Sequence, residues 1–268
     1  VVAAWIATPS HYAAIQNPKY RVLGVSRIGN YWAVEFGGYA DSAMTADIGP
    51  VDYATAVNAA SYGDGGAPGM LASLFGTFLG GSSTTEALTS LPLPTTLLSI
   101  EVHVDGQQAG LIFVSNNQIN FQIPATVGTG VKMVDVYRNG TLVSRGNLTI
   151  AASFGALFTA NASGTGAPAG QYTDDGAIYN LLFDASRNPV TFKPGPDTKP
   201  TYLVLYGTGL SAIGAQNLQV YVYEDVTQTY YPCEIAYLGP QGQFVGLDQL
   251  NIKLLGVLGT IPGPKKLV

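Results

Sequence analysis

The sequence predicts an all-β protein, in which two tandem immunoglobulin-like β-sandwich modules follow a short N-terminal helix-plus-hairpin segment. Two observations carry this prediction. Short segments of alternating apolar and polar residues surround the dipeptides Asp105-Gly106 and Asn139-Gly140, which favour the positive φ angles of tight hairpin turns. In addition, three segments recur later in the chain in the same order, which indicates two copies of one structural plan.

The N-terminal residues 1–38 are expected to form one helix and one hairpin. Apolar residues within residues 1–16 favour a helix, which Asn17-Pro18 would end. Strands are predicted at residues 20–28 and 31–36, joined by a tight Gly-Asn turn. Residues 39–54 have no clear period and contain Gly, Asp, Ser and Pro, so they are interpreted as a linker.

The first module is predicted to cover residues 55–150. Ile100, Val102 and Val104 share one face of a strand, whereas Glu101 and His103 share the other. Antiparallel sheets with one apolar face bury it against a second sheet, so this pattern favours a sandwich. Strands are predicted at residues 71–75, 99–104, 111–114, 119–123, 132–138 and 142–150.

The second module is predicted to cover residues 151–268, because residues 73–79, 99–104 and 118–123 return there as residues 204–210, 218–223 and 249–254. Further short strands are expected at residues 155–159 and 177–182. No clear counterpart of the hairpin at 132–150 follows residue 254. We therefore expect the second module to lack its last hairpin and to leave a strand edge and an apolar groove open.

Composition excludes several functional classes. Of the 268 residues, 12 are Lys or Arg, and the net charge is -5, which does not suit a nucleic-acid surface. No apolar run is long enough to span a bilayer.

The single cysteine, Cys233, leaves no intrachain disulfide and is expected to be a small buried residue. The N-terminus lacks a signal-peptide pattern, so the chain is expected to be a processed or partial product.

No catalytic, cofactor-binding or metal-binding residue is predicted, and the protein is expected not to be an enzyme. His11 and His103 are the only histidines; the first is assigned to a residual polar pocket or a packing role, and the second to a solvated strand face. Asp174-Asp175 and Glu224-Asp225 favour turns, with calcium sites as the alternative. Gly207-Thr208-Gly209 superficially resembles a phosphate loop, but it is explained as part of the internal repeat.

Tyrosine is used 16 times and clusters at Tyr221, Tyr223, Tyr230 and Tyr231. Tyrosine rings stack on sugars and also suit protein interfaces. The alternative is that these residues are present because tyrosine favours strands. The cluster therefore suggests a binding surface without identifying its ligand.

Seven short segments between residues 55 and 255 form a recognisable set: VNAAS at 57–61, LFGT at 74–77, LPLPT at 91–95, VS at 114–115, QINFQ at 118–122, YGTGL at 206–210 and GLDQLN at 246–251. On these segments, about residues 55–255 resemble the uncharacterised C-terminal domain of large secreted acidobacterial (Solibacter-type) proteins. This resemblance implies secretion and a β fold, but no reaction.

A second set of residues lies within residues 1–38: Trp5, Pro9-Ser10-His11, Ile15, residues 17–20, Gly24-Val25, Tyr31-Trp32 and Phe36-Gly37. On these residues, the segment is similar to the C-terminal end of a CAP-superfamily domain. The resemblance places His11 at one histidine of the two-His, two-Glu pocket of that family. The other three members of the pocket would lie upstream of Val1, so this chain departs from the family pattern there.

These observations favour a non-enzymatic structural protein of the bacterial cell surface or extracellular space. Copies would assemble head to tail into a filament, the second module of each being completed by a strand from a neighbour. The N-terminal segment, residues 1–38, is the expected donor. The alternative is a secreted accessory module that binds carbohydrate or another surface ligand. Neither function involves nucleic acid or a membrane span.

Overall fold

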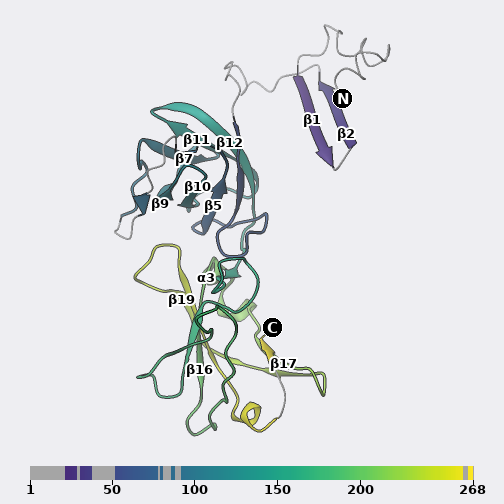
Figure 1. Ribbon diagram of the computed structural model, residues 1–268, viewed down its shortest axis with the longest axis vertical. Coiled ribbons are helices and arrows are strands. Elements are labelled where there is room, and N and C mark those ends of the chain that lie inside the picture. The colour runs from purple at the N-terminus through teal and green to yellow at the C-terminus, as the bar shows by residue number, and fades with distance from the viewer. Residues whose placement is uncertain are drawn as a thin grey trace. The chain divides into compact units, whose positions relative to one another are not determined.

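The computed structural model describes residues 22–28, 31–37, 52–77, 79–80, 86–87, 92–261 and 265–267. The chain forms two compact units, residues 1–50 and 51–268. In the first unit, β1 (Val22–Ile28) pairs antiparallel with β2 (Tyr31–Gly37), which confirms the predicted hairpin (Figure 1). The helix predicted within residues 1–16, His11, and most of the linker lie outside the described residues.

The first part of the second unit is a β-sandwich, as predicted, and it consists of two five-stranded sheets (Figure 1). One sheet has the order β4 (Thr55–Asn58), β5 (Leu71–Phe75), β10 (Gln118–Gln122), β9 (Gly110–Val114) and β6 (Glu86–Ala87). The other has the order β3 (Asp52–Tyr53), β12 (Thr141–Ile150), β11 (Gly130–Arg138), β7 (Ile100–Val104) and β8 (Gln107–Gln108).

The two glycine dipeptides form the turns that the sequence predicts. Asp105 and Gly106 have φ angles of 53° and 77°, and Asn139 and Gly140 have φ angles of 49° and 74°. Both central residues of each turn are thus left-handed, as a type I′ hairpin requires. The first turn joins β7 to β8, and the second joins β11 to β12.

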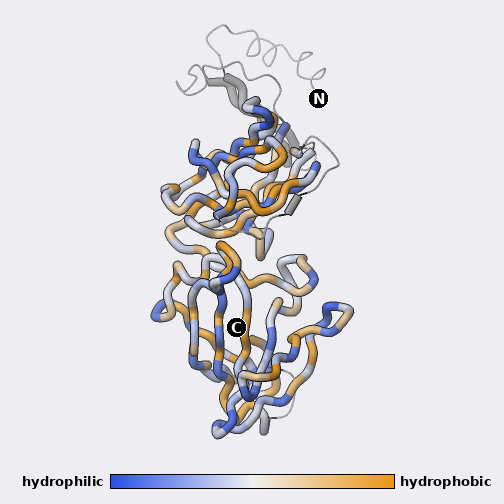
Figure 2. Tube along the Cα trace, turned by 90° about the vertical axis from the view of Figure 1, so that its left-hand side faces the viewer, coloured by the Kyte–Doolittle hydropathy of each residue, from blue (hydrophilic) through white to orange (hydrophobic). Residues whose placement is uncertain are grey.

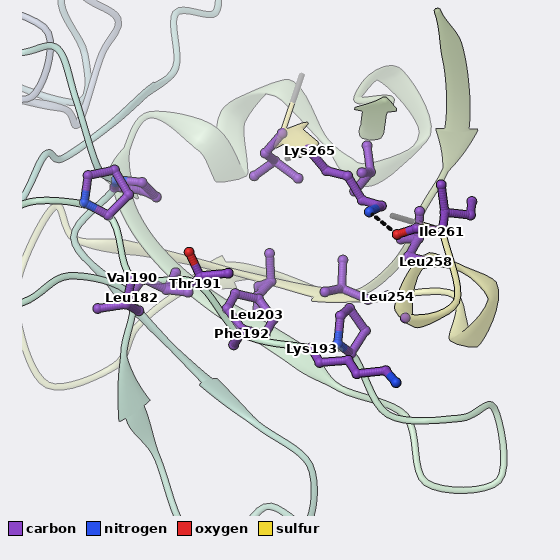
Figure 3. Close-up of a pocket in the computed structure, with 16 residues that line it drawn as sticks. Leu182, Val190, Thr191, Phe192, Lys193, Leu203, Leu254, Leu258, Ile261 and Lys265 are labelled. Carbon is purple, nitrogen blue, oxygen red and sulfur yellow. Dashed lines mark hydrogen bonds between the residues drawn. The ribbon is translucent and has the colours of Figure 1, made fainter. Parts of the chain in front are cut away.

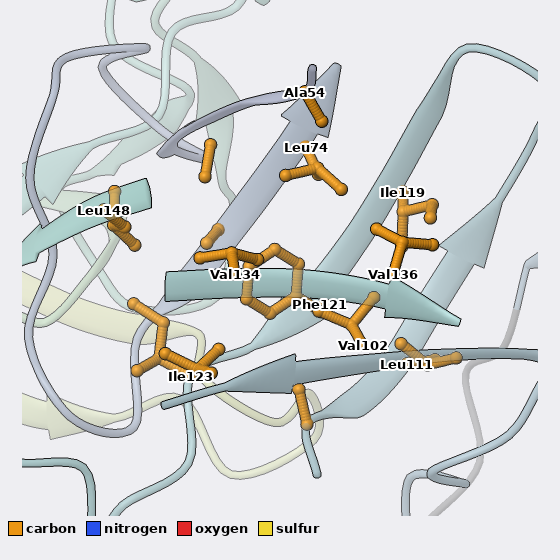
Figure 4. Packing of buried hydrophobic residues seen from close by; sticks show 14 of the residues in the cluster. Ala54, Leu74, Val102, Leu111, Ile119, Phe121, Ile123, Val134, Val136 and Leu148 are labelled. Carbon is orange, nitrogen blue, oxygen red and sulfur yellow. The ribbon is translucent and has the colours of Figure 1, made fainter. Parts of the chain in front are cut away.

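The core of this sandwich draws residues from both sheets. Ile100, Val102 and Val104 of β7 are all 0% exposed, and so is Phe121 of β10. Figure 4 shows the Phe121 ring among Val102, Val134 and neighbouring aliphatic side chains. The alternation seen in the sequence therefore marks a real division between buried and outer faces.

The second sandwich has its own core and two sheets. The larger sheet has the order β15 (Asn180–Leu181), β14 (Gly170–Thr173), β16 (Tyr202–Thr208), β20 (Asp248–Lys253) and β19 (Glu234–Pro240), with β13 (Ala156–Leu157) also paired to β16. The smaller sheet has the order β18 (Thr229–Pro232), β17 (Tyr221–Glu224) and β21 (Lys265–Leu267). Short helical turns are α3 (Leu210–Ile213), η2 (Ala215–Asn217) and η3 (Gly256–Gly259).

Strand pairing confirms that the two sandwiches follow one plan. Leu74 of β5 faces Ile119 of β10, and their counterparts Leu205 and Leu250 face each other in β16 and β20. A register shift follows Asn120 in the β10–β9 pair. The β20–β19 pair has a shift at the corresponding place, after Asn251. A bulge at the same position in both copies shows that the repeat extends to irregular features.

One correspondence predicted from sequence is shifted by a single residue. The sequence repeat aligns residues 99–104 with 218–223, but the buried residues of the second copy are Val220, Val222 and Glu224. These align with Ile100, Val102 and Val104, so the true counterpart is 219–224. Because side chains alternate along a strand, a shift of one residue exchanges the buried and outer faces.

The end of the second module also differs from the expectation of a missing hairpin. β21 pairs antiparallel with β17, just as β11 pairs with β7. Leu267 faces Val222 in the way that Val136 faces Val102. β21 is therefore the counterpart of β11, the first strand of the hairpin that we expected to be missing. The sequence did not predict it, because three residues are too few to show an alternating pattern.

Apolar residues are spread along the strands of both sandwiches and do not form one continuous run (Figure 2). Among the described residues, no helix has the length and apolar character needed to span a membrane.

Candidate binding surfaces in the second module

Three of the four clustered tyrosines form an aromatic face on the outer side of β17 and β18. Tyr223 faces Tyr230 across the two strands, and their ring centroids are 4.7 Å apart at an angle of 41°. The rings of Tyr221 and Tyr230 meet edge to face, with centroids 6.1 Å apart. Tyr231 instead faces Val222 and packs against the core. Strand alternation thus divides the cluster into three outer rings and one inner ring.

This aromatic face (Tyr221, Tyr223 and Tyr230) offers both apolar and polar contacts. Tyr230 is 57% exposed, and the Tyr221 hydroxyl donates a hydrogen bond of 2.9 Å to Gln219 Oε1. The face of a tyrosine ring can stack on the C–H groups of a sugar, while hydroxyl and amide groups form hydrogen bonds with the hydroxyl groups of the sugar. The rings are tilted against one another, so Tyr230 offers a single exposed ring and not a flat row of rings.

A second feature is an apolar groove between the two sheets, with a volume of about 470 Å³ (Figure 3). Its walls come from β16, β17 and β21, from η3, and from the loop that follows β15. Leu203, Leu254 and Leu258 line it, and both of its charged lining residues, Lys193 and Lys265, are basic. Lys265 Nζ donates a 2.7 Å hydrogen bond to the Ile261 carbonyl at its rim. The sequence predicted an open groove here without identifying these residues.

His103 lies on the outer face of β7, as predicted, where it has partners. Its Nε2 is 3.1 Å from Glu101 Oε2, and its ring packs on Tyr137 with centroids 4.7 Å apart. The hydrogen bond with His103 holds the pKa of Glu101 below its ordinary value, with a further contribution from Gln108. The His103–Glu101 pair is half-buried on the strand surface, and it is part of neither the aromatic face nor the groove.

Asp174 and Asp175 both accept hydrogen bonds, Asp175 within its own turn and Asp174 from a residue much later in the chain. Asp175 accepts hydrogen bonds from the backbone N–H groups of Ile178 and Ala177, which lower its pKa. The hydroxyl of Thr201 donates to Asp174. In the described part of the chain, no three His, Cys, Asp or Glu side chains gather as a potential metal site.

Glu224 is a buried carboxylate at the end of β17. It accepts hydrogen bonds from the Thr227 hydroxyl at 2.5 Å, the Thr227 N–H at 2.8 Å and the Val226 N–H at 2.7 Å. These bonds, that of the Thr227 side chain first, lower its pKa from the ordinary value of 4.5. They fold the chain back from β17 into β18, which carries Tyr230, so the carboxylate helps to position the aromatic face.

Replacing Glu224 with glutamine should flatten the acid dependence of stability. Because the folded-state pKa lies below 4.5, the charged form stabilises the folded state fully above pH 4.5 and progressively less as the pH falls through the lower value. Wild-type protein should therefore lose stability more steeply than E224Q between pH 5 and pH 3, measured as the urea midpoint. Equal slopes would contradict this role.

Gly207-Thr208-Gly209 lies at the contact between the two sandwiches. Thr208 Oγ1 accepts a 2.9 Å hydrogen bond from the Leu71 N–H of the first sandwich and donates one of 2.7 Å to the Gly246 carbonyl. Gly209 has a φ of 72°. The motif therefore has a structural role at the contact between modules, consistent with its explanation as part of the repeat.

Cys233 is half-buried and packs against the core of the second sandwich. Burial raises the pKa of its thiol. Cys233 is thus less buried than the sequence predicts, although it packs on the core as expected, and its raised pKa does not favour reactivity, because a thiol becomes reactive when its pKa is lowered.

The described surfaces define a class: a two-module β-sandwich protein with an exposed aromatic face and an apolar groove. Neither a protein-family model nor a curated protein matches the chain. It is similar to two solved auxiliary nutrient binding proteins, from Bacteroides ovatus ATCC 8483 and Bacteroides thetaiotaomicron VPI-5482, at 11% and 10% identity with TM-scores of 0.25 and 0.26. The matches cover 68% and 75% of this chain, which spans only 58% and 61% of those proteins.

Proposed function

We propose that this protein is a non-enzymatic, extracellular accessory module that binds carbohydrate through the aromatic face of its second sandwich. The observation that carries the proposal is the contact of three tyrosine rings outside the core, with Tyr230 57% exposed. The preference of tyrosine for strands explains its presence in β17 and β18. Strand alternation and the pairing of β17 with β18 then place three of the rings on one outer face, where Tyr230 stays exposed.

The chemistry of this face suits a neutral, hydroxyl-rich ligand. Tyr221 and Tyr223 alternate with buried residues along β17, so their rings and hydroxyl groups are held by a paired strand. A rigid ring with a polar tip loses little conformational freedom on binding. Gln219 adds an amide beside the Tyr221 hydroxyl. We propose an extracellular location because the sequence resembles secreted acidobacterial proteins.

Replacing Tyr230 with alanine should weaken carbohydrate binding about tenfold, equivalent to about 1.4 kcal/mol. The measurement is calorimetric titration with soluble hexasaccharides of glucose, xylose and mannose. Tyr237→Ala is the matched control, because Tyr237 is 42% exposed but lies on β19 and bonds the Pro240 carbonyl. Absence of binding to every hexasaccharide, or an equal loss in the control, would reject the proposal.

Assembly of copies into a filament through strand pairing stays a prediction from the sequence. It requires a strand donor, for which residues 1–38 were named above.

A further inference from the structure

A second, smaller cavity lies within the compact unit Val51–Val268, where the first sandwich meets the second, and its volume is about 260 Å³. Its walls come from the loop that follows β4 and from the segment that follows β13, with Ile112 of β9 at one side. Its floor is formed by residues of β5 and β10 that point away from the core, namely Leu71, Ser73, Gln118 and Asn120. Both sandwiches therefore contribute side chains to this junction cavity.

Hydrogen bonds within the two wall loops hold the junction cavity in shape. Asn58 Oδ1 accepts bonds of 2.8 Å and 2.9 Å from the N–H groups of Ala60 and Ser61. Thr159 Oγ1 accepts a bond of 3.1 Å from the Gly164 N–H. A Cβ at Gly164 would overlap the Ser61 carbonyl oxygen, so the two loops lie in direct contact. A ligand would find these walls already ordered, which lowers the entropic cost of binding.

The floor of the cavity offers polar groups that the fold leaves available. Asn120 Oδ1 accepts hydrogen bonds from Ser73 Oγ at 3.0 Å and from Gln118 Nε2 at 2.8 Å. Among the described residues, Asn120 Nδ2 and Gln118 Oε1 have no hydrogen-bond partner. A neutral amide both donates and accepts hydrogen bonds. The two amides can therefore donate to one group of a ligand and accept from another.

The remaining lining residues are mainly apolar, and they include the rings of Tyr62 and Phe158. No described residue that lines the cavity is charged. An ionic ligand would lose its hydration without gaining an opposite charge, which is costly. The cavity therefore suits a neutral molecule with an apolar face for the rings and hydroxyl groups for the amides.

The internal repeat shows which part of this arrangement the fold explains by itself. In the second sandwich Gln249 Nε2 donates an equivalent 2.9 Å hydrogen bond to Asn251 Oδ1. Val204 faces Asn251 there, in the place where Ser73 faces Asn120. The amide pair thus belongs to the common plan, but Gln249 and Asn251 do not line the junction cavity.

We propose that the junction cavity binds one neutral sugar ring, either free or at the end of a glycan. The amides of Gln118 and Asn120 form hydrogen bonds with its hydroxyl groups, and Phe158 and Tyr62 pack on its C–H groups. A volume of about 260 Å³ lies below the roughly 300–1,000 Å³ of pockets for drug-sized ligands, so a single ring is the expected size.

This site is separate from the aromatic face on β17 and β18, and it does not rest on the function proposed there. None of the tyrosines of that face lines the junction cavity. Tyr230→Ala should therefore leave binding in the cavity unchanged, so failure of one proposal does not decide the other.

The test is titration of the isotope-labelled full chain with glucose, galactose, mannose and xylose, followed through the side-chain amide signals in NMR spectra. At least one sugar should shift the signals of Gln118 and Asn120 saturably, with a Kd of about 1–10 mM. The signals of Gln249 and Asn251 should not move. Comparison with the methyl glycoside of that sugar separates the two sources. A glycoside that binds equally well indicates the end of a glycan, and one that does not bind indicates a free sugar.

A matched pair of variants uses the internal repeat as its control. Gln118→Ala should weaken sugar binding about three- to tenfold, the effect of losing one hydrogen bond. Gln249→Ala removes the equivalent amide from the second sandwich and should leave binding unchanged. Phe158→Leu keeps an apolar side chain but removes the ring face, and should also weaken binding. Circular dichroism checks the fold of each variant, and the amide signals of the unaltered protein require no substitution.

Each of four outcomes would overturn the proposal. The first is that no sugar shifts the signals of Gln118 and Asn120. The second is that Gln118→Ala and Gln249→Ala weaken binding equally. The third is that cyclohexanol, which has the ring but a single hydroxyl group, binds as tightly as the best sugar. The fourth is that Tyr230→Ala abolishes the shifts, which would assign sugar binding to the aromatic face alone.

Discussion

Replacing Phe121 with alanine should lower the free energy of unfolding by about 3–5 kcal/mol, the usual range for removal of a buried aromatic ring. Phe121 is 0% exposed and lies within the core cluster of the first sandwich (Figure 4). Its ring contacts side chains from both sheets, so its loss leaves a cavity at the centre of the sandwich. Urea denaturation followed by far-UV circular dichroism measures the change.

Phe244→Ala provides the control for this experiment. Phe244 is 49% exposed, and its removal should change the free energy of unfolding by less than about 0.5 kcal/mol. If both variants lost similar stability, the assignment of Phe121 to the core would be wrong.

Replacing Gly209 with alanine should be the second large effect, roughly 2–5 kcal/mol. Gly209 has a φ of 72°, and a left-handed backbone costs a residue with a Cβ about 1–2 kcal/mol. The added Cβ would also overlap the Phe154 carbonyl oxygen and lie 2.5 Å from Met70 Sδ. Overpacking of this kind adds about 1–3 kcal/mol.

Gly106→Ala separates these two contributions. Gly106 has a similar φ of 77°, but a Cβ there would meet nothing within 4 Å. It should therefore show only the backbone cost of about 1–2 kcal/mol. Thermal denaturation of both variants measures the difference, and equal destabilisation would show that the contact with Phe154 and Met70 relaxes freely.

The candidate surfaces could be predicted only in part. The tyrosine cluster was visible in the sequence, but the pairing of Tyr223 with Tyr230 decided which rings face outward and sent Tyr231 inward. The open groove was expected from the repeat. Its lining residues were not, because they come from segments between Pro168 and Leu267 that only the fold brings together.

Some strands gave little local signal. β14 (Gly170–Thr173) and β19 (Glu234–Pro240) were not predicted. β14 contains glycine and polar residues. In β19, an edge strand, most residues are exposed or half-buried, so burial does not alternate cleanly. β21 consists of three residues and is identified by its pairing with β17 alone. In all three, pairing with a neighbouring strand supplies the order that local sequence does not specify.

The sequence by itself determined the all-β class, the hairpins at Asp105-Gly106 and Asn139-Gly140, and the existence of two sister sandwiches. These features depend on local φ preferences and on strand alternation, both of which act between near neighbours in the chain. Tertiary structure alone decided the one-residue shift between β7 and β17, the place of β21, and the groove beside Leu254. Those depend on which strands pair and which faces meet, and non-local packing fixes both.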